Sequence, residues 1–177
     1  MEITANSKYD YDAAKALVYL GMYRKSNPKK VFRSRMIFSA ILFLTVIIEM
    51  IVFGFDPCFL ILLVVVLLLP CLLCFLHFAV PKIQYRSMAK MKELENTFVF
   101  RDDSIDIVSK GEQYSGTARI RYSLLVKAAE TSQYLFLYQT NSQVFIVDLS
   151  TIAGGSPNGI RNKLYSFLGK RYIVCKY

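Results

Sequence analysis

The chain has 177 residues and a formal net charge of +9, with 22 Lys and Arg against 13 Asp and Glu. This length suits one ordinary domain, or a small domain joined to membrane segments. The positive charge does not indicate a nucleic-acid partner, because no recognition helix or aromatic RNA-binding motif accompanies it. The four Cys do not indicate a disulfide framework, since three lie in one apolar segment and the fourth lies near the C-terminus.

Residues 1–35 are expected to form a cytoplasmic N-terminal helix and a basic juxtamembrane segment. Residues 1–9 can form a short extended piece. A helical pattern opens at residues 10–12, where acids favour the first turn, and it stops by residues 26–28. Four Tyr surround this helix, so we expect it to pack on another element or to lie at an interface.

Two apolar segments, 36–54 and 58–79, predict a hairpin of transmembrane helices. At about 1.5 Å per residue, both are long enough to cross a hydrocarbon core of about 30 Å. Both must be helical, because unpaired backbone groups are costly in lipid. The first is not a cleavable signal peptide, since a long organised segment precedes it and no cleavage motif follows it. Pro70 predicts a kink in the second helix, and Pro81 predicts a break after it.

Basic residues around the hairpin predict its orientation. Lys and Arg gather before the first span and after the second, whereas the turn at 54–57 has none. Both termini are therefore expected on the cytoplasmic side of the membrane, with that turn outside. We expect the basic side chains to face anionic lipid headgroups, at about 1 kcal/mol for each well-placed charge. They are Lys29, Lys30, Arg33, Arg35, Lys82, Arg86 and Lys90.

Glu49 and Asp56 are the only formally charged residues between positions 36 and 79. Asp56 is expected in the outer turn. Glu49 lies about 7.5 Å along the helix axis from Gly54, close enough for its side chain to reach the outer interface. An acid inside a membrane segment is often functional, so a role in proton or ion movement stays an alternative for Glu49. Neither span contains a basic partner for it.

Cys71, Cys74 and His77 follow the spacing C-x-x-C-x-x-H and are the candidate metal or redox residues. Three-residue steps spread them over about 120° of a helix, which can still be one face. A metal site needs four ligands, or three and a water, and no second thiol pair lies nearby. We therefore expect no metal and no cofactor. We interpret His77 as a polar residue that marks the inner end of the span.

Residues 80–96 are expected to form a basic juxtamembrane helix, and residues 97–177 a small cytoplasmic domain. From residue 97 the apolar pattern changes from helical to alternating, which predicts about six antiparallel strands. The clearest strands are 134–138 and 144–147, joined by a hairpin turn. The aromatic face of the first of these is interpreted as core rather than as a surface that stacks nucleic-acid bases.

A helix is expected to close the domain. Ser156 and Pro157 are typical of an N-cap and a first helical position, and Gly169 is typical of a helix end. One apolar stripe lies between them, formed by Ile160, Leu164, Phe167 and Leu168. The predicted fold class is therefore α+β: a two-helix transmembrane hairpin and a small antiparallel β domain capped by a C-terminal helix.

No catalytic residue is predicted. A Ser-His-Asp or Cys-His mechanism in the cytoplasmic domain is excluded, because the only His lies in the second span. The acids Asp102, Asp103 and Asp106 fall at a turn and along a strand, consistent with hydration and edge protection. The glycine-rich loop at 154–159 precedes a helix but matches no phosphate-binding motif. An enzyme is not indicated.

This order of elements resembles the YcxB-like membrane protein family of Gram-positive bacteria. The likeness covers nearly the whole chain: an N-terminal helix that runs into KKVFRSR, two adjacent spans and a C-terminal block. In that block, FVFRDDSIDIVSKGEQY, YLFLYQTNSQVFIVDLS and IRNKLYSFLGKRYIVCKY are similar to the family's strands and final helix. The resemblance implies a pleckstrin-homology-like domain, a bent antiparallel sheet capped by one helix. It implies no activity and no functional residues.

We therefore expect a membrane-anchored cytoplasmic interaction module. Its partner would be another protein, a second copy of the chain or the anionic lipid surface. The hairpin would hold the module near the bilayer, and the basic flanks would set its orientation. The alternative is a small accessory subunit of a transporter or immunity system, with the hairpin packed against partner helices.

Overall fold

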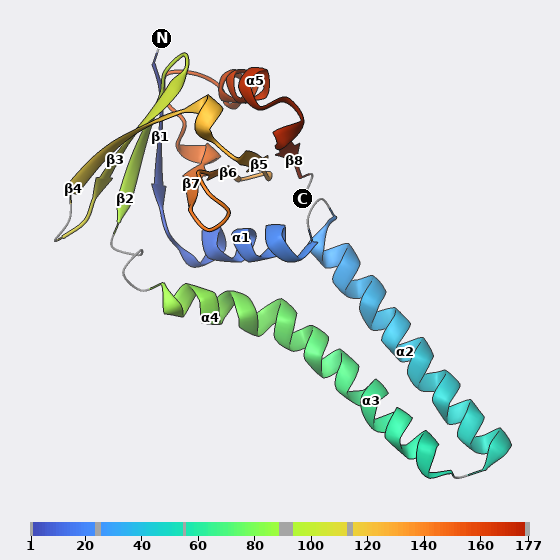
Figure 1. Cartoon of the computed structure of the whole chain (residues 1–177). Coiled ribbons are helices and arrows are strands. Elements are labelled where there is room, and N and C mark those ends of the chain that lie inside the picture. The colour runs from blue at the N-terminus through green and yellow to red at the C-terminus, as the bar shows by residue number, and fades with distance from the viewer. Residues whose placement is uncertain (1, 24–25, 55, 89–93, 113–114, 176–177) are drawn as a thin grey trace.

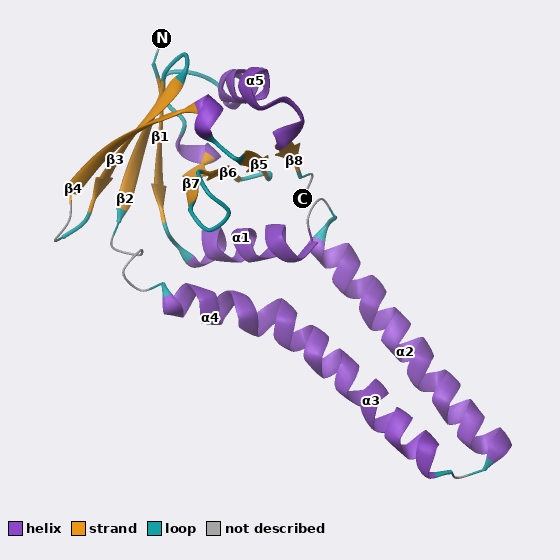
Figure 2. Cartoon of the chain, in the orientation of Figure 1, coloured by secondary structure: helices purple, strands orange, loops and turns teal. Residues whose placement is uncertain are grey.

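The computed structural model describes residues 2–23, 26–54, 56–88, 94–112 and 115–175. It contains a β domain, made of two four-stranded sheets with helices around them, and a long helical hairpin that extends away from it (Figure 1). Figure 2 shows that the hairpin is entirely helical apart from its tip, and that the strands are confined to the domain. The α+β class with two long apolar helices is therefore confirmed.

Each sheet contains four strands. The first has the order β1-β2-β3-β4, and its neighbouring strands are antiparallel. Its members are β1 (Ile3–Lys8), β2 (Glu95–Phe100), β3 (Ser104–Lys110) and β4 (Ser115–Arg121). The second has the order β7-β6-β5-β8, in which β5 and β8 pair in parallel and the other pairs are antiparallel. Its members are β5 (Lys127–Glu130), β6 (Tyr134–Tyr138), β7 (Val144–Asp148) and β8 (Tyr172–Val174).

The N-terminal strand corrects the predicted domain boundary. We expected the domain to begin at residue 97, but β1 pairs with β2 along its whole length, beginning with Ile3 opposite Phe100. Ile3 and Ala5 are buried in the main core. Six extended residues carry too little pattern to identify a partner that lies beyond the whole hairpin in sequence. The hairpin is therefore an insertion between two neighbouring strands of one sheet.

Strand β6 is buried on both faces, which explains its unbroken run of apolar and aromatic residues. Its two Leu face the main core between the sheets. Its three rings, Tyr134, Phe136 and Tyr138, pack in a second cluster under α1 (Tyr11–Tyr23). The interpretation of this aromatic face as core is confirmed, and the predicted N-terminal helix is the element that covers it.

The predicted closing helix is confirmed as α5 (Pro157–Leu168). The Ser156 side chain accepts a hydrogen bond from the Gly159 N–H at 3.3 Å, as expected of an N-cap. Three members of the predicted stripe are buried against the core, namely Ile160, Leu164 and Leu168. Short 3-10 turns complete the domain: η3 (Tyr122–Leu124), η4 (Leu149–Thr151) and η5 (Gly169–Arg171).

The first arm of the hairpin begins earlier than predicted. Helix α2 runs over Pro28–Phe53 instead of starting at residue 36. Asn27 caps it, because its side-chain oxygen accepts the N–H groups of Lys29 and Lys30, and Pro28 occupies the first helical position. The basic residues before the apolar segment are good helix formers, so the helix extends through them.

The second arm is one continuous helix in three parts: α3 (Pro57–Cys74), the π-helical turn η1 (Phe75–Ala79) and α4 (Val80–Ser87). The predicted break at Pro81 is wrong. The wider π turn, in which the Val80 N–H binds the Phe75 carbonyl, makes room where the proline ring would meet a regular helix. Of the predicted helix over 80–96, the part to Ser87 is confirmed as α4, Glu95 and Asn96 belong instead to β2, and residues 89–93 lie outside the described residues.

Candidate functional site

The hairpin exposes most of its apolar surface. Both arms are long and apolar enough to cross a membrane, judged by length and composition. In α2, only 17% of the most apolar 18-residue stretch is buried, and in the second arm only 6% of the corresponding stretch is buried. The arms bury Val46, Met50 and Val66 against each other. The core helix of a soluble protein is mostly buried, and the two arms of the hairpin are not.

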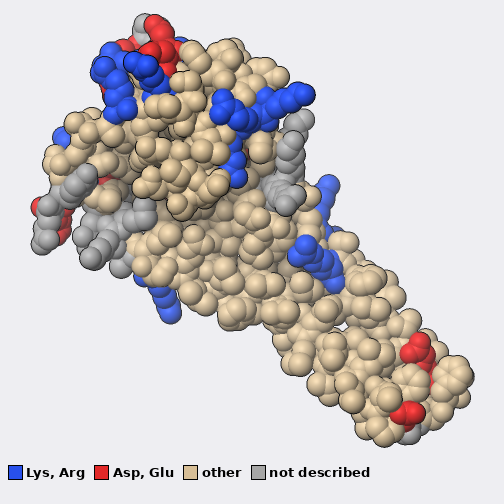
Figure 3. All heavy atoms as spheres, viewed as in Figure 1, with Lys and Arg blue, Asp and Glu red and all other residues tan. Residues whose placement is uncertain are grey.

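Charges separate along the hairpin. Exposed cations gather at the end joined to the β domain, which we call the domain end: Lys29, Lys30, Arg33 and Arg35 on α2, and Lys82 and Arg86 on α4. Lys90 lies outside the described residues. The exposed acids Glu49 and Asp56 lie near the opposite tip, shown in red in Figure 3. Asp56 caps α3, since its carboxylate accepts the Cys58 N–H at 2.9 Å.

His77 is not a polar end marker, as the sequence suggested, but a buried residue at a junction of three elements. Its side chain is only 7% exposed. The Tyr23 hydroxyl lies 2.8 Å from Nδ1 and the Tyr19 hydroxyl 3.1 Å from Nε2. The rings of Phe32 and Tyr19 stack on the imidazole at centroid distances of 4.3 and 4.9 Å. We call these four residues, which join α1, α2 and η1, the His77 joint.

The backbone of His77 also takes part in the joint. The Tyr19 hydroxyl donates to the His77 carbonyl at 3.2 Å. In an α-helix that carbonyl would accept the N–H of residue 81, but Pro81 has no N–H to donate. Two features that the sequence presents separately, a single His and a proline four residues later, therefore act together. The π-helical turn lies where both the carbonyl and the imidazole of His77 contact α1.

The two Tyr of the joint stay protonated at any working pH. Burial, together with the neighbouring Tyr23 and Tyr11 hydroxyls, raises the pKa of Tyr19 to about 12. Burial also raises the pKa of Tyr23, although the Arg35 guanidinium, 5.8 Å from the centre of its ring, acts in the opposite direction. Each hydroxyl therefore has one hydrogen to donate and one oxygen that can accept.

The candidate Cys–His set is not assembled. Cys71 is exposed and Cys74 is half-buried, whereas His77 turns into the joint with α1. Among the residues that the structure describes, no group of three or more His, Cys, Asp or Glu could hold a metal ion. The C-x-x-C-x-x-H spacing therefore does not correspond to a shared site.

Sequence reasoning missed a buried ion pair that holds α5 to the second sheet. Glu130, at the end of β5, is only 5% exposed, and it accepts hydrogen bonds from Arg161 of α5 and from the Tyr172 hydroxyl of β8. Burial alone would raise the pKa of Glu130, but the hydrogen bonds from Arg161 and Tyr172 outweigh it, and this pKa lies below its usual value. No local pattern distinguishes this acid from a surface one.

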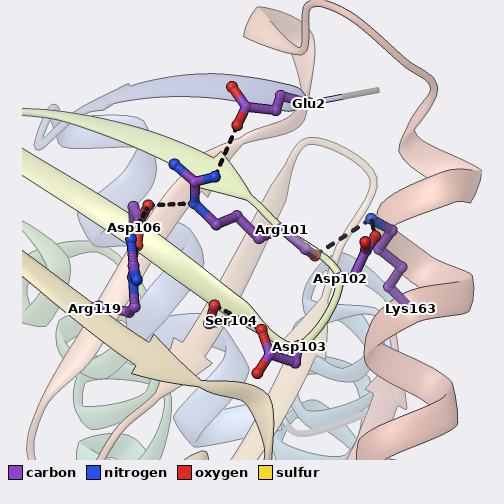
Figure 4. A network of polar contacts seen from close by, with 8 residues as sticks. All are labelled: Glu2, Arg101, Asp102, Asp103, Ser104, Asp106, Arg119 and Lys163. Atoms are coloured by element: carbon purple, nitrogen blue, oxygen red, sulfur yellow. Dashed lines mark hydrogen bonds and ion pairs between the residues drawn. The ribbon is translucent and has the colours of Figure 1, made fainter.

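Asp102 in the turn after β2 and Asp106 on β3 belong to surface ion pairs, whereas Asp103 accepts a hydrogen bond from the Ser104 hydroxyl at 2.9 Å (Figure 4). The pairs are Arg101–Glu2, Arg101–Asp106, Arg119–Asp106 and Lys163–Asp102. Hydrogen bonds from Arg119 and Arg101 lower the pKa of Asp106 to about 2. This carboxylate thus connects neighbouring strands and stays ionised, which suits a structural contact better than acid–base chemistry.

A cavity of about 740 Å³ lies where α1 and α4 meet the ends of the sheets. Apolar side chains line it together with amide and hydroxyl groups, and it has one described cation, Lys127, whose ammonium lies 4.3 Å from the centre of the Tyr138 ring. Its lining includes Met88 and Leu94, which border residues 89–93, outside the described part of the chain. We therefore assign no ligand to it.

Comparisons of the chain with protein-family models, with curated proteins and with solved structures found no match. The function must therefore be argued from the chemistry of two features of the described residues. One is the exposed apolar hairpin with cations at its domain end. The other is the His77 joint, through which the β domain holds that end.

Proposed function

We propose that the chain is a two-span protein of a bacterial plasma membrane. It holds a pleckstrin-homology-like β domain at the cytoplasmic surface as an interaction module for a protein partner or for anionic lipid. The observation that carries this proposal is the separation of charge along an exposed apolar hairpin. Cations gather at the domain end and acids near the tip. A lipid bilayer with an anionic inner surface matches both the apolar length and the positive end.

The pleckstrin-homology-like part of the proposal rests on the C-terminal helix that closes the domain. Two largely antiparallel sheets enclose one main core, and a C-terminal helix packs over it. The hairpin is inserted between β1 and β2, so both of its ends return to the same edge of the domain. This double attachment would place the module close to the bilayer.

Contacts at the domain end give the module a fixed orientation. Tyr85 of α4 packs on Tyr9 and Tyr11, with ring centroids 6.2 and 5.8 Å apart. The Tyr9 hydroxyl donates to the Met88 sulfur at 3.2 Å. The two arms are thus bound to each other through α1, which itself covers the second sheet. A module held in this way presents one defined face to the membrane.

The electrostatic part of the proposal predicts the effect of removing basic side chains. Replacing Lys29, Lys30 and Lys82 together with Gln should weaken the binding of anionic lipid about 100-fold, from about 1 kcal/mol for each charge. The measurement is native mass spectrometry of the purified full chain, titrated with phosphatidylglycerol and with phosphatidylcholine. Phosphatidylcholine binding should not change, because that headgroup has no net charge.

The matched control replaces three cations of the β domain that lie away from the hairpin in sequence, Arg121, Lys163 and Lys170. This variant loses the same total charge and should keep the binding of phosphatidylglycerol. If the two triple variants lost anionic lipid equally, the effect would reflect net charge alone. The proposed contact at the domain end would then be wrong.

The exposed hairpin also supports a second candidate function, that of a small accessory subunit. Large apolar side chains cover the outer faces of both arms, as the high exposure of Ile48 and Leu68 illustrates. Transmembrane helices of a permease could cover them as well as lipid does. Blue-native electrophoresis of membranes solubilised in mild detergent separates the two candidates. Co-migration with a permease supports the subunit, and a lone species argues against it.

A further inference from the structure

We infer that the His77 joint is a proton-sensitive coupling between the hairpin and the β domain. The joint is closed while the imidazole is neutral and loosens when His77 takes up a proton. The inference rests on the hydrogen bonds of the joint and on the charges around it. It does not require that the basic residues bind lipid.

The hydrogen bonds of the closed joint are consistent with only one neutral form of His77. Tyr19 has one hydroxyl hydrogen, and it donates this to the His77 carbonyl, which can only accept. Nε2, 3.1 Å from the same hydroxyl, must therefore carry a hydrogen and donate it to the Tyr19 oxygen. Nδ1 then has no hydrogen and accepts from Tyr23 at 2.8 Å. In this form every polar group of the joint has a partner.

A proton on Nδ1 disrupts this arrangement. Nδ1 becomes a donor, so the Tyr23 hydroxyl must turn to accept, and its own hydrogen loses its acceptor. Tyr23 is only 6% exposed, and a buried donor without a partner is costly. The stacked rings attract a cation weakly, but this attraction does not replace the lost hydrogen bond.

The charges around the joint also oppose a proton on His77. The titratable and charged groups in contact with the joint are Tyr19, Tyr23 and Lys15 of α1 and Arg35 of α2. Asp12 of α1 and Lys29 of α2 line a cavity together with Lys15 and Tyr19, and Lys82 lies farther along the helix of His77. Lys15 and Arg35 lie over the rings of Tyr19 and Tyr23, at 5.7 and 5.8 Å. No described carboxylate forms an ion pair with the imidazole.

The consequence is a loosening of the C-terminal half of α1 from the hairpin. The N-terminal half of α1 packs on the second sheet through Ala13 and Ala14 and also contacts α4 through the Tyr11 and Tyr85 rings, whereas its C-terminal half holds η1 through Tyr19 and Tyr23. The closed joint favours the neutral imidazole, so closing is strongest above the ordinary histidine pKa of about 6.5 and weakens as the pH falls. Acidification therefore weakens the contact of the β domain with η1, while the contact of Tyr11 with Tyr85 on α4 remains.

The first test uses the fact that His77 is the only His in the chain. Nitrogen-15 labelling of His in the full chain, in nanodiscs of phosphatidylcholine, gives NMR signals from this imidazole alone. At about pH 8 we expect hydrogen on Nε2 and none on Nδ1. Tyr23→Phe should raise the titration midpoint by about one pH unit, since Nδ1 loses its donor. Hydrogen on Nδ1, or a midpoint that Tyr23→Phe leaves unchanged, overturns the inference.

The second test measures the coupling itself by hydrogen exchange. After correction for intrinsic exchange chemistry, amides in the C-terminal half of α1 should exchange at least about tenfold faster at about pH 5 than at about pH 8. The control is His77→Gln, which keeps a polar group but cannot take up a proton in this range, and it should show no such change. An equal change in both chains, or none in the natural chain, contradicts the inference. Both tests use neutral lipid, so the outcome of the titration and of the hydrogen exchange does not depend on whether the chain binds anionic lipid.

Discussion

A chain of residues 94–177 alone should not fold, whereas residues 2–23 joined to residues 94–177 by a flexible linker should form a soluble, cooperative domain. The linker of about 15 Gly and Ser residues replaces the hairpin and lets β1 and α1 return to their places. Without β1, the edge of β2 is unpaired, and the core loses Ile3 and Ala5. Without α1, the aromatic face of β6 is open to water.

The free energy of unfolding that residues 94–177 are expected to lose without β1 and α1 is comparable with the whole stability of a small domain, about 5–15 kcal/mol. Circular dichroism, amide NMR dispersion and urea unfolding measure it. Within the linked chain, Ile3→Asp should destabilise the domain by about 3 kcal/mol, because it buries a carboxylate in the core. Asn6→Asp is the matched control on the same strand, with an exposed side chain, and should have little effect. Cooperative unfolding of residues 94–177 alone, at a similar midpoint, would contradict the domain boundary that we describe.

Arg161→Leu should lower the free energy of unfolding of the linked domain by about 3 kcal/mol. The change leaves Glu130, only 5% exposed, without its charged partner. The Arg161 side chain is 40% exposed, so we take the lower end of the range for broken buried pairs. The matched control, Lys163→Leu on the same helix, breaks a pair with the fully exposed Asp102. This control should change the free energy of unfolding only slightly. If both variants lost the same free energy of unfolding, the Arg161–Glu130 pair would contribute no more to stability than a surface pair.

The same pair predicts a pH dependence. The folded-state pKa of Glu130 is lowered, so its contribution is present above the unfolded value of about 4.3 and is lost as the pH falls through the folded value. The stability difference between the natural linked domain and the Arg161→Leu variant should therefore narrow below about pH 4. Urea unfolding at several pH values measures it, and a difference that widens towards acid would contradict this account.

The parts of the fold that the sequence predicted are those with strong local signals. The N-cap at Ser156 and the apolar stripe after it define α5 within one element. The apolar lengths of the two arms define the hairpin in the same way. Strand β6 is clear because it is buried on both faces, which makes its residues apolar or aromatic without interruption.

The parts that could not be predicted depend on partners far away in sequence. β1 is six residues long and pairs with a strand that follows the whole hairpin. Glu130 resembles a surface acid until α5 and β8 bring Arg161 and Tyr172 to it. For His77 there was a partial signal, since a lone His near the end of an apolar helix and several Tyr on a nearby helix could have suggested a contact.

The most direct test of the central claim, a two-span hairpin with the β domain on the cytoplasmic side, is the accessibility of single Cys residues in intact bacterial cells. In a chain whose four native Cys are replaced by Ser, a Cys is introduced by Asp56→Cys near the tip or by Ser132→Cys on the exposed turn before β6. We predict that a membrane-impermeant maleimide labels the Asp56→Cys chain in intact cells and the Ser132→Cys chain only after the membrane is permeabilised. Labelling of the Ser132→Cys chain in intact cells, or protection of the Asp56→Cys chain, would contradict the account.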